Sequence, residues 1–212
     1  MRPVRDRASR ERALALVPPD AESLLRDGSI AIVPTDTVYG VAAAAYRRPA
    51  CDRLYRLKHR PPDQPTAIML GSVENLLQNV LPELMGRAGV LCGRAFPGPW
   101  TLVLPNPGRR FAYLCGASPD RIGVRVPDLH PDVAALADAV GGLGTTSANL
   151  RGEHAPSTVD AVPAELRRES AFEIDLGPLP GTPSAVVDVT GHEPIVVREG
   201  PRLDELLERL RG

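Results

Sequence analysis

The chain has 212 residues, of which 43% are hydrophobic and 24% are charged, and its formal net charge is −1. This composition is typical of a soluble globular protein with a substantial core, and the near-neutral charge excludes bulk nucleic-acid binding through an overall basic field. Aromatic residues make up only 4% of the chain, which argues against a base-stacking platform for single-stranded RNA. A local basic groove stays compatible with these numbers.

The cysteines and the N-terminus limit the cellular setting. Cys51, Cys92 and Cys115 are far apart and odd in number, which predicts reduced thiols in a cytoplasmic protein and neither a disulfide framework nor a metal site. Residues 1–12 carry five arginines without an apolar stretch, so we expect a basic mobile tail there and no secretory signal. No apolar run approaches the roughly 20 residues that cross a bilayer, so no membrane contact is expected.

Hydrophobic periodicity and turn residues predict that helices and strands alternate along the chain. In the first half we predict, in order, a helix at Ala21–Asp27, a strand at Ser29–Val33, a helix at Ala50–Lys58, a strand at Thr66–Leu70, helices at Val73–Leu77 and Pro82–Arg94, and a strand at Trp100–Leu104. In the second half we predict a strand at Arg121–Val126, a helix at Pro131–Val140, a flexible glycine-rich approach and turn over 141–149, strands at Ala171–Asp175, Ala185–Val189 and Ile195–Val197, and a helix at Leu203–Leu210. This mixture favours one α/β domain over residues 13–212, with a twisted, mixed sheet and flanking helices.

The only lysine of the chain, Lys58, lies just before Arg60 and Pro61, whereas every other basic residue is an arginine. A lysine offers a compact point charge on a flexible stem and an arginine offers a planar fork, so the two types are not interchangeable around phosphates. Lys58 and Arg60 together could therefore hold a polyphosphate. The alternative is that they form a solvated helix end.

Two segments rich in hydroxyl groups could also carry chemistry. Pro34–Gly40 directly follows a buried strand, where α/β folds commonly bind ligands, although Thr35 and Asp36 could equally cap their own turn. Gly144–Asn149 places three hydroxyls after a glycine-rich stretch and could cradle an anion, but it lacks the residue order of a P-loop.

Three arginines are placed on predicted strands or at their ends. Arg121 and Arg125 are four residues apart and hence share one strand face, so each needs an anionic partner from the protein or from a ligand. Arg198 follows an apolar strand and allows the same two interpretations. No catalytic triad is predicted, because the nucleophile elbow Gly-x-Ser-x-Gly is absent.

Taken in order, these segments resemble the YrdC family, whose best-known members are threonylcarbamoyl-AMP synthases. Seven motifs carry the resemblance, namely Pro34–Gly40, Lys58-x-Arg60-Pro61, Phe96–Thr101, Val124–Pro127, Ser147–Asn149, Pro183-Ser184 and Val197–Gly200. Each motif is weak by itself, but seven in the family's order span nearly the whole chain. Because the sequence ends at Gly212, it resembles the short, single-domain members.

The resemblance implies a largely parallel sheet around a concave basic cavity and a synthase that makes threonylcarbamoyl-AMP and pyrophosphate from L-threonine, bicarbonate and ATP. It also implies Mg²⁺ as a companion of ATP, and a cytoplasmic role in t6A modification of tRNA at position 37. The product would pass to a tRNA threonylcarbamoyl transferase complex, and a weak contact with RNA or tRNA is compatible with this role.

The family's functional residues map onto ten positions of this chain. The implied catalytic and ATP-binding residues are Lys58 and Arg60, joined for ATP by Gln64, Arg121, Ser147 and Arg198, and the implied threonine-binding residues are Thr37, Arg125, Thr145 and Ser184. Departures from the family pattern occur at Gln64, Met69, Ala155 and Ala185. Each departure loses at most one hydrogen bond, so we expect weaker substrate binding with the fold intact.

Two other functions are compatible with the same motifs. One is a YrdC-like paralogue that acts on, or hydrolyses, another carbamoyl-adenylate. The other is an RNA-binding module that uses the basic cavity. The Lys58–Arg60 pair favours ATP handling, and the neutral net charge disfavours RNA binding as the main task.

Overall fold

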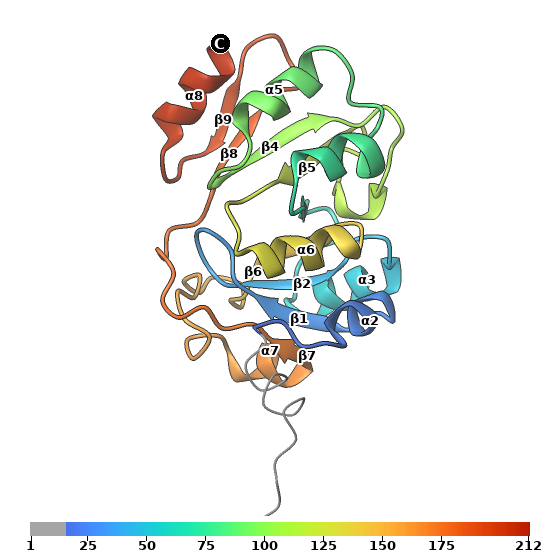
Figure 1. The fold of residues 1–212 in the computed structure, drawn as a ribbon, viewed down its shortest axis with the longest axis vertical. Helices are drawn as coiled ribbons and strands as arrows, with labels where there is room; N and C mark the ends of the chain where they lie inside the picture. The colour runs from blue at the N-terminus through green and yellow to red at the C-terminus, as the bar shows by residue number, and fades with distance from the viewer. Residues whose placement is uncertain (1–15) are drawn as a thin grey trace, which may run out of the picture.

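The computed structural model describes residues 16–212, so the tail expected at 1–12 lies outside the described residues. Within them, nine strands form one sheet in the order β7-β1-β2-β6-β3-β5-β4-β8-β9 (Figure 1). The strands are β1 (Ile30–Val33), β2 (Gly40–Ala44), β3 (Ala67–Met69), β4 (Trp100–Pro105), β5 (Arg121–Arg125), β6 (Leu143–Ser147), β7 (Ser170–Glu173), β8 (Ala185–Asp188) and β9 (Ile195–Arg198). The helices are α2 (Ala21–Arg26), α3 (Arg48–Leu57), α4 (Val73–Asn75), the π-helical η1 (Leu76–Val80), α5 (Arg87–Ala95), the 3₁₀-helical η2 (Ala112–Leu114), α6 (Pro131–Ala139), α7 (Ala164–Glu169) and α8 (Leu203–Arg211).

The sheet is mixed, which confirms the predicted α/β class. Parallel pairs join β1 to β7, β3 to β5, and β4 to β8. The other five pairings are antiparallel, a larger share than the sequence suggests. Two of the antiparallel pairs, β1–β2 and β8–β9, follow from the short connections 34–39 and 189–194. A parallel crossover needs about a dozen residues or more.

The sequence predicts a flexible glycine-rich approach and a turn over 141–149. This prediction is wrong for Leu143–Ser147, which form β6 between β2 and β3 in the sheet. β2 consists mainly of Gly and Ala, and its partner β6 is rich in Thr. Neither strand has the alternating apolar pattern of a half-buried strand. Gly40 pairs with Ser147 at one end of this contact. A Cβ atom at Gly40 would lie 2.8 Å from the side chain of Thr145, so the two strands approach closely only because residue 40 is glycine.

Two helix boundaries also differ from the prediction. The helix expected at Pro82–Arg94 begins only at Arg87, after Gly86 adopts a left-handed φ of 60°. The helix expected at Val73–Leu77 continues as a π-helix to Val80. The short helix α7 is a further element that the sequence pattern did not predict.

Two apolar clusters pack on the sheet and fix the elements that carry the polar motifs. The smaller one joins α2 and α6 to β1, β2 and Met69. The larger one includes Ala50, Cys51 and Leu54 of α3 together with the fully buried Trp100 of β4. Since α3 is anchored through this face, the residues just after its last turn have a fixed position. No helix within residues 16–212 has the length and apolar character required to cross a membrane.

Candidate functional site

A cavity of about 870 Å³ brings together nine of the ten predicted site residues. These nine are Lys58, Arg60, Gln64, Arg121, Arg125, Thr145, Ser147, Ser184 and Arg198. The tenth, Thr37, is fully buried and does not line the cavity, whereas its neighbour Thr35 does. Of the departures from the family pattern, Gln64, Met69 and Ala155 line the cavity, and Ala185 is buried in β8.

Lys58 follows the last residue of α3 and is only 5% exposed. Its Nζ donates hydrogen bonds to the carbonyl oxygen of Ser147, and to Thr146 Oγ1 and Asn149 Oδ1, both at 3.4 Å. Burial and, secondarily, the nearby charge of Arg60 lower the pKa of Lys58 to about 8. No carboxylate within residues 16–212 forms an ion pair with this ammonium.

Arg60 reaches the same strand as Lys58. Its Nη1 donates to Thr146 Oγ1 at 3.1 Å, its Nη2 donates to the carbonyl oxygen of Pro65, and its buried Nε has no partner in the described structure. The guanidinium carbon lies 5.9 Å from the ring centroid of Tyr55. Burial is the main cause that lowers the pKa of Arg60, and Arg198 contributes to the same direction.

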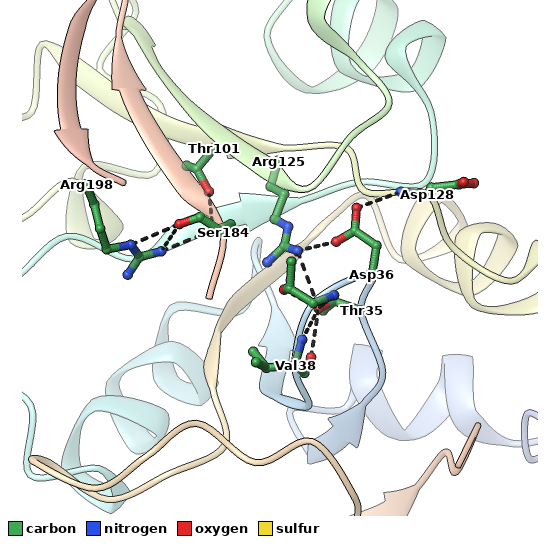
Figure 2. A network of polar contacts seen from close by, with 9 residues as sticks. Thr35, Asp36, Val38, Thr101, Arg125, Asp128, Ser184 and Arg198 are labelled. Carbon is green, nitrogen blue, oxygen red and sulfur yellow. Dashed lines mark hydrogen bonds and ion pairs between the residues drawn. The ribbon is translucent and has the colours of Figure 1, made fainter. Parts of the chain in front are cut away.

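Arg198 is the last residue of β9 and lines the cavity opposite Arg125 (Figure 2). Its Nε and Nη2 donate to the carbonyl oxygen of Ser184 at 2.9 and 2.7 Å, and Ser184 Oγ lies 3.3 Å from Thr101 Oγ1. Burial and then the charge of Arg125 lower the pKa of Arg198. Lys58 is thus a buried cation, Arg60 a half-buried one and Arg198 an exposed one, and none of the three has a carboxylate partner among the described residues. Such an arrangement favours the binding of an anion.

Arg121 and Arg125 of β5 differ from these three cations because each has an ion-pair partner within the protein. Arg121 Nη1 lies 2.8 Å from Asp188 Oδ2 at the half-exposed rim. Arg125 is deeply buried, and its Nη2 contacts Asp36 Oδ1 and donates to Thr37 Oγ1 at 2.7 Å. The internal ion pairs considered from the sequence are therefore present, although both arginines also line the cavity.

The hydroxyl-rich segment of β6 supplies acceptors for the cations. Ser147 Oγ donates to Asn149 Oδ1 at 2.5 Å, and Asn149 Nδ2 donates to the carbonyl oxygens of Leu150 and Glu153. Thr145 Oγ1 donates to the carbonyl oxygen of Leu143. Thr146 and Asn149 are not among the predicted site residues, although Asn149 stands in one of the motifs and both contact Lys58.

The described residues contain no group of three His, Cys, Asp or Glu side chains that could hold a metal ion. Asp36 lies within the predicted ligand segment Pro34–Gly40. Its carboxylate pairs with Arg125 and accepts a hydrogen bond from the backbone N–H of Asp128 at 3.1 Å. Asp188 is likewise engaged by Arg121 and by Thr190. The cavity therefore suits anionic ligands and offers a metal little beyond scattered carboxylates.

The chain is similar to known proteins in sequence and in fold. The family model Sua5_yciO_yrdC, described as "Telomere recombination", matches residues 23–200. The chain is 32% identical to the threonylcarbamoyl-AMP synthase of Bacillus subtilis over 91% of this chain and 56% of that protein. It is also 32% identical to the threonylcarbamoyl-AMP synthase of Rattus norvegicus over 89% of this chain and 68% of that protein.

A solved structure of Sua5 from Pyrococcus abyssi, complexed with L-threonine, matches with a TM-score of 0.79 and 31% identity. The match covers 91% of this chain and 56% of that chain. The present chain thus spans little more than half the length of the Bacillus and Pyrococcus proteins.

Proposed function

The chain belongs to the Sua5/YciO/YrdC family, and we propose that it is an L-threonylcarbamoyladenylate synthase. In this reaction L-threonine and bicarbonate form a carbamate with loss of water, and the carbamate and ATP give threonylcarbamoyl-AMP and pyrophosphate. The names of the Bacillus and rat relatives and the threonine complex of the Pyrococcus neighbour support the proposal.

The observation that carries the proposal is the distribution of charge within one cavity. Lys58, Arg60 and Arg198 have no carboxylate partner in the described structure, whereas Arg125 is paired with Asp36. A triphosphate carries several negative charges and suits the three unpaired cations. The threonine carboxylate carries one charge and suits the guanidinium of Arg125, whose local charge is already reduced.

This arrangement also orients the two substrates for the bond that forms. The carbamate on the threonine amine attacks the α-phosphorus of ATP, the bond from that phosphorus to the bridging oxygen breaks, and pyrophosphate leaves with the electron pair. The nucleophile is already an anion, so positioning and charge stabilisation carry the rate and no strong general base is needed. Lys58 and Arg60 stabilise the charge on the leaving pyrophosphate, and Arg198, which faces the same space as Arg125 (Figure 2), holds the reacting phosphate.

The remaining predicted residues line this cavity in secondary roles. We propose that Ser147, Gln64 and Arg121 contact the nucleotide, while Thr145 and Ser184 border the amino-acid pocket. Thr37 is assigned a supporting role behind Arg125, because its side chain is fully buried and accepts a hydrogen bond from that guanidinium.

We further propose that Mg²⁺ enters with ATP and is held mainly by phosphate oxygens and water. The described residues offer no metal-binding cluster, and this mode is common for Mg²⁺ with nucleotides. When bound, the ion neutralises phosphate charge. The labile product would pass to a tRNA threonylcarbamoyl transferase complex, and residues 13–212 would act as one unit, since the cavity draws residues from Thr35 to Arg198.

The test uses purified protein with ATP, L-threonine and labelled bicarbonate. We expect labelled threonylcarbamoyl-AMP and one pyrophosphate per product. Threonine-independent ATP turnover without this product would favour the paralogue that acts on another carbamoyl-adenylate. Tight tRNA binding that weakens steeply with salt, without ATP chemistry, would favour the RNA-binding module.

A further inference from the structure

Asp36 lies behind the cavity wall and has no substrate contact in the proposed reaction. Its side chain is 10% exposed, and Asp36 is not among the cavity-lining residues. One carboxylate oxygen faces Arg125 Nη2, and the other accepts the backbone N–H of Asp128 at 3.1 Å (Figure 2). Asp36 therefore links the loop after β1 to the end of β5 through Arg125 and to the segment after β5 through Asp128.

The contacts of Arg125 leave part of its guanidinium available to a ligand. Nη2 is occupied by Asp36, by Thr37 Oγ1 at 2.7 Å and by Thr35 Oγ1 at 3.4 Å. Nη1 makes no hydrogen bond within residues 16–212 and is the group open to a ligand, whereas Nε is buried there without a partner. Figure 2 shows the guanidinium of Arg125 on the far side of the same space from that of Arg198, with Asp36 on the side away from Arg198.

Four cations of the cavity influence one another. Burial is the main cause that lowers the pKa of Lys58, Arg60 and Arg198, and the charges of Arg60, Arg198 and Arg125, respectively, add to it. Among these four, only Arg125 has an adjacent carboxylate, which opposes the effect of burial on its pKa. Three of the charges are therefore uncompensated, and the fourth is locally neutralised.

We propose that Asp36 is a positioning residue that sorts the two anionic substrates. It fixes Arg125 and reduces its net charge, so that this end of the cavity accepts a singly charged carboxylate and disfavours phosphate. Without Asp36, Arg125 would join the other three as an uncompensated cation, and its pocket would become a second phosphate site. The assignment of the carboxylate to an amino acid rests on the proposed function.

The kinetic test compares Asp36→Asn and Asp36→Ala with wild type. Asparagine keeps one acceptor for Arg125 but removes the charge, whereas alanine removes both. We expect KM for L-threonine to rise about 10-fold in Asp36→Asn and about 100-fold in Asp36→Ala, since a hydrogen bond to a charged group contributes effects of this size. Inorganic phosphate should compete with L-threonine in both variants and not in wild type.

Asp138→Asn provides the matched control. Its carboxylate also accepts a backbone N–H, that of Gly71 at 2.8 Å, but unlike Asp36 it contacts no arginine of the cavity within the described residues. We expect this variant to change stability without changing KM for L-threonine or the phosphate inhibition pattern. An unchanged threonine KM in Asp36→Asn, with no phosphate competition, would overturn the proposal.

A second measurement is independent of catalysis. Millimolar inorganic phosphate should raise the melting temperature of Asp36→Asn more than that of wild type, and Asp36→Asn/Arg125→Ala should lose the extra gain. Equal phosphate responses in wild type and Asp36→Asn would contradict the role of Asp36 whether or not the protein is a synthase. Conversely, an absent threonine-dependent product in wild type would remove the proposed function while this test of phosphate exclusion still stands.

Discussion

Lys58 has a buried ammonium that three oxygen atoms of residues 146–149 surround. Hydrogen bonds of this kind compensate only part of the free energy lost when a charge leaves water, which explains why burial is the main cause that lowers its pKa to about 8. The side chain therefore weakens the ligand-free fold while it prepares the site for an anion. Such a conflict between stability and function is common at binding sites.

We expect Lys58→Met to stabilise the ligand-free protein at pH 7 by about 1 to 3 kcal/mol, because the pKa falls from 10.5 to about 8 and each unit is worth about 1.4 kcal/mol before lost hydrogen bonds are subtracted. Between these pKa values the unfolded chain binds more protons at Lys58 than the folded chain does. The stability of wild type relative to Lys58→Met therefore rises with pH over that window, and the full penalty persists below about pH 8.

Denaturant unfolding of both proteins from pH 7 to pH 10 measures this difference, and other titrating groups cancel in it. ATP binding should be strongly weakened in Lys58→Met. A variant that is less stable than wild type at pH 7, or a stability difference independent of pH, would contradict the account.

At the same scale, some site residues are predictable from sequence and others are not. Lys58, Arg60 and Arg125 stand out because their residue type is unusual for its setting or shares a strand face, and all three line the cavity. Thr37, predicted to bind threonine, is buried with its hydroxyl toward Arg125, and Thr35, two residues earlier, lines the cavity. A turn can present either of two threonines that are two residues apart, and the sequence does not show which one faces the cavity.

Among the elements, the contact of β2 with β6 determines the shape of the cavity floor. Gly40 and Thr145 both line the cavity, and β6 carries the oxygen atoms that surround Lys58. A side chain at residue 40 would meet Thr145 Cγ2 at 2.8 Å and the carbonyl oxygen of Thr146 at 3.3 Å. The central strands can therefore hold their present spacing only with glycine at this position.

We expect Gly40→Ala to destabilise the protein by about 1 to 3 kcal/mol, the usual effect of overpacking, and to weaken ATP binding by displacing β6. Gly93→Ala is the matched control, since a Cβ atom there meets nothing within 4 Å and lies in α5. That control should be neutral or more stable by up to about 1 kcal/mol, because alanine favours helix. Thermal unfolding and ATP titration of the two variants measure both effects, and equal behaviour would refute the packing argument.

The elements themselves were predictable where hydrophobic periodicity was strong. β1, β4 and α3 have continuous apolar runs or amphipathic spacing, and each occurs close to its expected bounds. β6 has neither, and the apolar run of β2 consists mostly of alanine, so small residues and hydroxyls form both strands and the sheet around them supplies their stability. Tertiary packing thus overrides the local turn signal of Gly141–Gly144, which sequence alone cannot reveal.

For the whole molecule, the cavity joins parts of the sheet that are far apart in strand order. Lys58 and Arg60 contact β6 near the β1–β2 side, whereas Arg198 comes from β9 at the opposite edge. Lys58, Arg60 and Arg198 repel one another, so their charges oppose holding the two sides together in the ligand-free protein. A bound triphosphate reverses this situation, because one anion then attracts side chains from both sides.

β9 is the element most sensitive to this change, since it is a short exposed edge strand that pairs only with β8 among the described strands. Local opening of such an edge needs little free energy, and any ligand that binds only the closed form slows it. We expect amide hydrogen exchange of Ile195–Arg198 to slow at least tenfold on saturation with ATP, as mass action allows for a ligand well above its Kd. In Arg198→Ala, the same ATP occupancy should slow amide exchange in β6 and leave exchange in β9 unchanged. Slower exchange of β9 in that variant, or no slowing of β9 in wild type, would show that the triphosphate does not connect the two sides of the sheet.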